Sequence, residues 1–161
     1  MLKKILLLLV VVLIGIQFIR PKKNISTLVS ANDISTHYTV PPDVLNILKR
    51  SCYDCHSNNT VYPWYNNIQP VAWWLADHVK VGKEELNFSE FDTYPPKRQL
   101  HKLHAFVGQV NDDRMPLDSY LWIHKDAGLN KTQKDTVLQW ADGLLKLIAA
   151  KNNLPVETDE E

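Results

Sequence analysis

Both cysteines of the chain belong to one short motif, Cys52–Tyr53–Asp54–Cys55–His56, in which a histidine directly follows the second cysteine. The C-x-x-C-H spacing is typical of covalent haem attachment of the c type. Two sulfurs three positions apart on a helical turn project at nearby angles, so they can reach the two vinyl groups at one porphyrin edge. The motif therefore predicts thioether bonds at Cys52 and Cys55 and a proximal iron ligand at His56.

Two other uses of a C-x-x-C pair remain open. Structural zinc normally takes four protein ligands, and the chain has no second C-x-x-C, although a remote histidine could join His56 to complete a site. A thioredoxin-like redox motif needs a βαβ context, and no segment shows the period-two alternation of a strand. A zinc-binding structural protein is therefore the weaker alternative function.

A hydrophobic segment stands at the start of the sequence. Lys3 and Lys4 precede an apolar run over 5–19 that only Gly15 and Gln17 interrupt, a pattern typical of an export signal. As a helix the run would be about 22 Å long, against about 30 Å for a hydrocarbon core. No small-x-small cleavage site follows it, which favours a retained anchor over a cleaved signal. A buried core helix is the other alternative, although the run has no polar face.

The composition divides the chain into four parts. We expect a signal or anchor segment at 1–20, a Ser-, Thr- and Asn-rich tether at 21–39, a cytochrome c-like haem-binding domain at 40–150 and an acidic tail at 151–161. The 18 basic and 18 acidic side chains balance, which gives no electrostatic case for a nucleic-acid partner.

Apolar residues recur at helical spacing in several stretches, which predicts an all-α domain with long ordered loops. The expected helices run from Pro42 toward Cys52, over 71–81, from Lys97 onward and over 132–150. Gly82 is expected to cap the second helix at its C-terminus, and Asn130 to cap the fourth at its N-terminus. The expected irregular stretches are 57–70, 87–96 and 111–121. Loops of this length in a compact domain are consistent with wrapping a large prosthetic group.

A longer pattern extends the motif. It begins with CYDCHSNNTVYPWY over 52–65 and continues with Ile68, Pro70, His78, Gly82, Leu86–Asn87–Phe88–Ser89, Met115–Pro116, Tyr120–Leu121, His124 and Trp140. With these residues the chain resembles the bacterial haem-binding domain family, whose c-type cytochrome-like members carry CxxCH followed by HSN-T-PWY. The resemblance spans 40–140 and implies one covalent haem c. Because bacteria attach this haem outside the cytoplasm, it also implies a cell-envelope protein, inner-membrane anchored or exported, with its domain facing the periplasm.

The resemblance also bears on the second axial position of the iron. Met115 is the sole internal methionine and precedes a proline in an expected loop, the pattern that c-type cytochromes use for a distal thioether ligand. Core packing is the alternative for Met115. His78 and His104, on expected apolar helix faces, are alternative distal ligands, although a lone histidine there is more often hydrogen-bonded core. The remaining histidines are less favoured, namely His37, His101 and His124.

Two further residues are expected in the haem environment. Trp64 could pack on the porphyrin edge, and Arg114, which adjoins Met115, could pair with a propionate. Ordinary core packing for Trp64 and a solvated surface position for Arg114 are the alternatives.

Two classes of function follow. The first is an electron carrier, a membrane-tethered monohaem protein that serves a redox protein partner, and it is favoured because no nucleophile or acid–base constellation appears elsewhere in the sequence. The second is a haem enzyme or sensor, peroxidase-like or gas-binding, with an open sixth iron position. In that case His78 or His104 would act as a distal polar group.

Overall fold

The computed structural model describes residues 1–155 of the 161-residue chain. Within this range the chain is helical and contains no strand, which confirms the expected all-α class. The acidic tail predicted for 151–161 lies largely outside the described residues. In order along the chain, the elements are α1 (Leu2–Ile16), α2 (Ile34–His37), α3 (Pro42–Ser51), α4 (Tyr53–His56), η1 (Trp64–Asn67), α5 (Val71–Glu85), η2 (Phe88–Thr93), α6 (Pro96–Asn111), α7 (Asp118–Leu121), η3 (Lys125–Ala127) and α8 (Lys131–Asn152).

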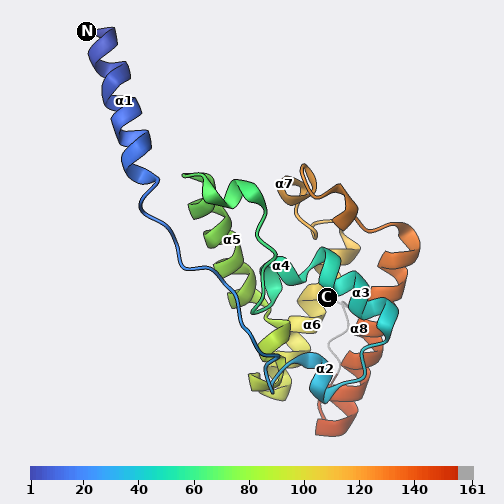
Figure 1. The fold of residues 1–161 in the computed structure, drawn as a ribbon. Coiled ribbons are helices and arrows are strands. Elements are labelled where there is room, and N and C mark those ends of the chain that lie inside the picture. The colour runs from blue at the N-terminus through green and yellow to red at the C-terminus, as the bar shows by residue number, and fades with distance from the viewer. Residues whose placement is uncertain (156–161) are drawn as a thin grey trace.

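The core lies between α3, α6 and α8. α6 and α8 pack along each other, and α3 packs against α8 (Figure 1). The apolar spacing that predicts these helices places Leu48, Leu103 and Ile148 in full burial, one from each helix. The shorter elements pack against these three helices.

The stretch 87–96, expected to be irregular, contributes directly to this core. Its residues form the short 3₁₀ element η2, and Phe88 and Phe91 are fully buried. The Phe88 ring stacks on Tyr53 at a centroid distance of 5.4 Å and meets Phe106 edge-on at 5.9 Å. Phe88 therefore joins α4 to α6.

The stretch 21–39, expected to be a tether, instead lies against the domain. Ile34 in α2 is fully buried in the core, and the Asp33 side chain caps α2 by accepting from the Ser35 backbone N–H. Earlier in the stretch, the Asn24 side chain donates to the Ser57 carbonyl at 2.8 Å and to Thr60 Oγ1 at 3.0 Å. The packed part of the chain thus begins before residue 40.

α1 extends away from the rest of the chain (Figure 1), and none of its residues is buried. The alternative of a buried core helix for 5–19 is therefore wrong. Among residues 1–155, the structure holds no helix with both the length and the apolar content needed to cross a membrane.

The N-terminal cap expected at Asn130 is confirmed. The Asn130 side chain accepts from the Gln133 backbone N–H at 2.9 Å, and the Gln133 side chain accepts from the Asn130 backbone N–H at 3.1 Å. This reciprocal pair is a capping box, which satisfies two of the backbone donors that a helix start leaves unpaired.

Replacing Asn130 with alanine is therefore expected to lower the free energy of unfolding by about 1 kcal/mol. The measurement is urea unfolding followed by circular dichroism. Asn46→Ala, at an exposed position inside α3, is the matched control and should leave stability unchanged or slightly higher, because alanine is the better helix former. Equal losses in both variants would contradict the capping role of Asn130.

Candidate functional site

The C-x-x-C-H motif forms a single helical turn. Cys52 lies at the junction of α3 and α4, and its carbonyl accepts from the backbone N–H groups of Cys55 at 3.2 Å and His56 at 3.0 Å. Both cysteines carry free thiols and are partly buried. The turn therefore presents two thiols and an imidazole from adjacent positions, as the motif spacing predicts.

The His56 ring is held by the backbone that follows α5. Its Nδ1 lies 2.9 Å from the carbonyl oxygen of Leu86. Because a carbonyl can only accept, Nδ1 carries the proton and Nε2 keeps its lone pair. Burial lowers the pKa of His56, against opposing effects of the Leu86 and Gly82 backbone and of the charge of Glu85. A neutral imidazole with one nitrogen fixed by a hydrogen bond is the usual form of a histidine metal ligand.

The two thiols are held in the protonated form. Burial raises the pKa of Cys52 to about 12, with a smaller contribution from Cys55. Burial also raises the pKa of Cys55 to about 11, assisted by the charge of Asp54. Redox-active cysteines of the thioredoxin type have lowered pKa values, and residues 1–155 contain no strand that could form a βαβ unit. Both findings argue against the thioredoxin-like alternative.

Helix α5 approaches the motif at Gly82. A Cβ atom at this position would lie 2.8 Å from the Cys55 carbonyl oxygen and 3.0 Å from the Cys55 Cβ atom. The expected role of Gly82 as a C-terminal cap is wrong, because α5 continues to Glu85. Gly82 instead allows close contact between α5 and α4.

Three cavities adjoin the motif, and we name them A, B and C. Cavity A, of about 270 Å³, lies between α4, η1, α5 and α7 and is lined by Cys55. Cavity B, of about 330 Å³, is lined by both cysteines and His56. Cavity C, of about 310 Å³, is lined by Cys52 and His56 beside α3 and α6. The three cavities share wall residues around the motif, and their walls are largely apolar. Largely apolar space therefore surrounds the thiols and the imidazole.

A buried polar atom at these cavities also lacks a partner. Ser51 is 7% exposed and lines cavities B and C. Its Oγ has no hydrogen-bond partner among the described residues, which is costly for a buried hydroxyl unless a bound group satisfies it. Adjacent thiols, a free imidazole nitrogen, apolar space and an unsatisfied hydroxyl together fit a haem with carboxylate side chains.

The structure brings some of the expected distal ligands to this space. Met115, in the segment after α6, is partly buried and lines cavities B and C together with His56. His78 lines cavities A and B, with its ring 4.2 Å from that of Trp74 and its Nδ1 2.9 Å from the Trp74 carbonyl. His104 lies on α6, outside the walls of these cavities as the described residues form them.

The two residues expected in the haem environment differ in placement. Trp64 lines cavity A but is 76% exposed. Arg114 is exposed and pairs with Asp112, and among the described residues it is not part of the walls of cavities A, B and C. Cavity A is therefore the only one of the three to which either residue contributes.

Sequence reasoning did not single out a polar cluster on the wall of cavity A. The Tyr120 hydroxyl donates to Asp54 Oδ2 at 2.7 Å, and the Tyr65 hydroxyl lies 2.6 Å from His124 Nε2. The Tyr120 and His124 rings stack at 4.3 Å. Burial and the neighbouring Asp54 raise the pKa of Tyr120. The signal that could have indicated this cluster was the longer pattern itself, which contains Asp54, Tyr65, Tyr120 and His124.

Lys102 was also missed. It is buried on α6 and lines cavity C, and its Nζ donates to the carbonyls of Glu84, at 3.1 Å, and Glu85. These are carbonyls of the last turn of α5, where a cation is favourable. Lys102 thus secures the end of α5, directly before the Leu86 carbonyl that holds His56.

The zinc alternative lacks a ligand set in the described part of the chain. Residues 1–155 contain no group of three or more His, Cys, Asp or Glu side chains arranged to hold a metal ion. A remote histidine does not complete the site that the motif would begin.

An all-helical domain that surrounds a C-x-x-C-H turn with apolar cavities defines a helical haem-binding protein. The chain belongs to the haem-binding domain family, because the sequence profile of that family matches residues 11–143. The match starts inside α1 and ends inside α8, and it confirms the resemblance seen in the sequence. No curated protein and no solved structure matches the chain.

Proposed function

We propose that this chain is a membrane-anchored monohaem c-type protein that carries electrons. The observation that carries the proposal is the His56–Leu86 hydrogen bond. It leaves Nε2 available beside two free thiols, in a cavity that Met115 also lines.

The thiols of Cys52 and Cys55 would hold the haem covalently. Each thiol would form a sulfur–carbon bond with one vinyl group of the haem, and the thiol hydrogen would pass to the other vinyl carbon. The addition is balanced without an external oxidant. Both thiols are free and lie on one helical turn, as attachment to one porphyrin edge requires.

His56 and Met115 would hold the haem iron. When bound, haem supplies an iron that alternates between its ferrous and ferric states. The Leu86 carbonyl orients the imidazole, and the Met115 thioether favours the ferrous state relative to a second histidine. An iron held by both residues would have no position open to substrate, which favours an electron carrier over an enzyme.

A second candidate is a haem enzyme or gas sensor with an open sixth position. The observation that favours it is the Tyr65–His124 and Tyr120–Asp54 cluster on the wall of cavity A, beside Cys55. Such polar groups, together with His78, could assist proton transfer or bind a small ligand.

The cell envelope is the proposed location. Covalent haem attachment outside the cytoplasm, which the family resemblance implies, would place the residues after α1 on the periplasmic side. There α1 would serve as the anchor, and a redox protein would be the electron partner.

Met115→Ala in the full-length haem protein tests the ligation. The unchanged protein is expected to show a weak long-wavelength sulfur-to-iron band in its ferric state. The variant should lose this band and become largely high-spin, with a lower reduction potential, while covalent haem remains, because the cysteines are intact. Optical spectra and electron paramagnetic resonance measure this outcome.

His78→Ala is the matched control and should retain the band, since Met115 is untouched. A high-spin ferric spectrum in the unchanged protein would reject the carrier and favour the open-site alternative. Loss of low-spin ligation in His78→Ala alone would assign the sixth position to His78.

A further inference from the structure

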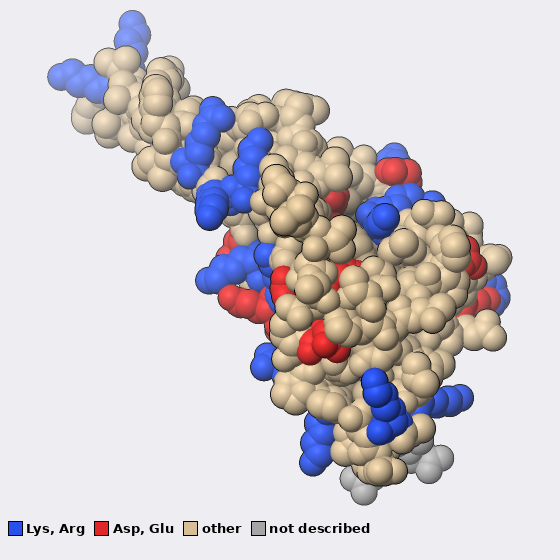
Figure 2. Space-filling model, turned by 60° about the horizontal axis from the view of Figure 1, so that its bottom comes forward, with Lys and Arg blue, Asp and Glu red and all other residues tan. Residues whose placement is uncertain are grey.

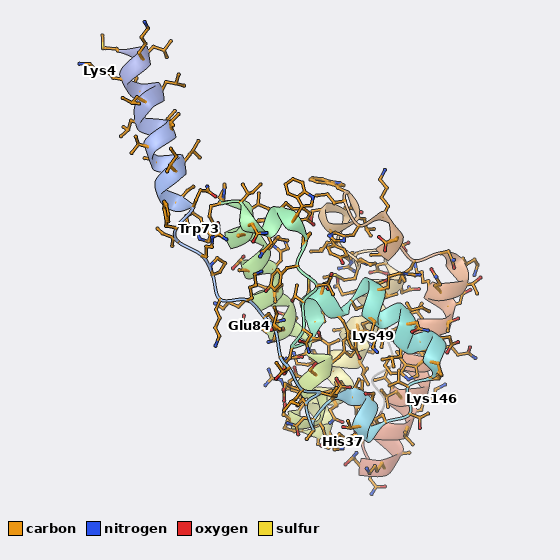
Figure 3. The ribbon with its side chains drawn as sticks, in the orientation of Figure 1. Lys4, His37, Lys49, Trp73, Glu84 and Lys146 are labelled. Carbon is orange, nitrogen blue, oxygen red and sulfur yellow. The ribbon has the colours of Figure 1, made fainter. Side chains whose placement is uncertain are left out.

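The end of α1 is fixed to the start of α5. Gln17 Nε2 donates to the Gln69 carbonyl at 3.2 Å, and the Gln69 backbone N–H donates to Gln17 Oε1 at 2.9 Å. The Ile19 carbonyl accepts from Gln69 Nε2 at 2.8 Å and from Trp73 Nε1 at 2.9 Å. Figure 3 shows Trp73 at this junction. Four hydrogen bonds therefore hold the domain at the base of α1.

The domain exposes large apolar side chains at the same end. Figure 1 shows η1, the first turns of α5 and α7 at the end from which α1 departs. Trp64 and Trp122 are 76% and 75% exposed there. We call this set the apolar rim: Val61, Trp64, Ile68, Trp74, Trp122 and Ile123. Four of its members meet around cavity A, namely Val61, Trp64, Trp74 and Ile123. Contiguous apolar surface of this kind marks an interaction site.

The charges near the rim favour a lipid surface as its partner. Arg20, Lys22 and Lys23 follow α1 on the side of the domain, and residues 1–32 contain no acidic side chain. In Figure 2 the N-terminal arm carries Lys and Arg at its tip and again where it meets the body, and Asp and Glu are confined to the body. Basic side chains beside apolar ones suit anionic headgroups above a hydrocarbon core.

The length of α1 gives a further reason. Its 15 residues extend about 22 Å, which is less than the hydrocarbon core of about 30 Å. A short inserted helix draws its flanking residues toward the bilayer. Tryptophan is the side chain most suited to that depth, because its ring is apolar and its N–H is polar.

We propose that the apolar rim rests in the headgroup region of the bilayer that holds α1, so that the domain is seated on the membrane. This inference rests on the proposed anchoring of α1. Cavity A is lined by rim residues and by Cys55. The seating would therefore orient the C-x-x-C-H motif toward the membrane surface.

Photolabelling tests the seating. The full-length haem protein is reconstituted into vesicles of phosphatidylcholine and phosphatidylglycerol that contain a diazirine phospholipid, and mass spectrometry maps the labels after illumination. Peptides with residues 2–16, Trp64 and Trp122 should be labelled at least about fivefold more than the peptide with Trp140, as expected for aromatic residues at the interface. Trp140 is the internal reference, because it lies on α8 with its Nε1 donating to the Thr39 carbonyl.

A double variant sharpens the test. Trp122→Ser with Ile123→Ser alters exposed residues only and should reduce labelling of the Trp64 peptide at least about twofold by removing interfacial anchors. Leu147→Ser, on the exposed face of α8, is the matched control and should leave that labelling unchanged.

Three outcomes would overturn the inference, and they can be told apart. In the first outcome, peptides with residues 2–16 are labelled, but the rim peptides are labelled no more than the Trp140 peptide. That result would keep α1 as an anchor and show that the domain does not contact the bilayer. No label in 2–16 would reject the anchoring itself. A dimer with a protected rim would show that a second copy covers it. Haem staining of the same samples reports covalent attachment separately.

Discussion

Replacing Cys52 and Cys55 together with serine is expected to abolish all haem that survives a denaturing gel. The two thiols are the chain's only cysteines, and no other side chain can form a thioether with a vinyl group. Each single variant should retain some haem through its remaining bond. Haem peroxidase staining and the intact mass of protein from a bacterium that attaches haem c measure the result.

Tyr53→Phe provides a matched control inside the motif. The Tyr53 hydroxyl is buried and has no hydrogen-bond partner among the described residues, so its removal should leave covalent haem in place. Staining that persists in the double serine variant would contradict the attachment. An intact mass of the unchanged protein that shows a disulfide and no macrocycle would do so equally.

Gly82→Ala is expected to lower the free energy of unfolding by about 1–3 kcal/mol, the usual cost of overpacking. The added Cβ would lie 2.8 Å from the backbone oxygen of Cys55, which cannot rotate away as a side chain could. Helices α4 and α5 would have to separate, and the Leu86 carbonyl would move away from His56. Haem incorporation should therefore fall together with stability.

Gly143→Ala is the control for this substitution. Gly143 lies inside α8 with open space beside it among the described residues, so alanine should raise stability by about 0.5–1 kcal/mol. Chemical denaturation of the two full-length variants compares them directly. The close approach would be rejected if both substitutions changed stability in the same direction by similar amounts.

The longer helices could be predicted because their signals are local. The buried faces of α3 and α8 follow from apolar spacing, and the start of α8 from the Asn130 cap. Element η2 has no such period, because its 3₁₀ turns are interrupted by a kink at Glu90 and each is too short to repeat. Ile34 likewise stands alone in a polar stretch, so only the folded core shows that it is buried.

Gly82 shows a different limit of sequence reasoning. A glycine after a run of apolar residues indicates a helix end as readily as a close approach between helices. The local pattern is the same in both cases, and only the position of Cys55, 27 residues earlier (82 − 55), separates them.

The residues of the candidate site also fall into two groups, those that the sequence identifies and those that only the fold brings together. Cys52, Cys55 and His56 could be identified because they are neighbours in the sequence. The Tyr120–Asp54 bond joins residues 66 positions apart, and only the folding of α7 onto α4 brings them together. Met115 needed the family resemblance for the same reason, whereas the structure places it among the residues that line cavity B with His56.

The acceptor that orients His56 is a main-chain oxygen, and this has an evolutionary consequence. No exchange of the side chain at position 86 can delete that oxygen, so mutation can alter the residue while the imidazole keeps its angle. Evolutionary changes in the orientation of the His56 ring should therefore arise from insertions, deletions or prolines that alter the backbone path at the end of α5. Position 86 itself is expected to vary only among apolar residues, because the Leu86 side chain is buried in the core.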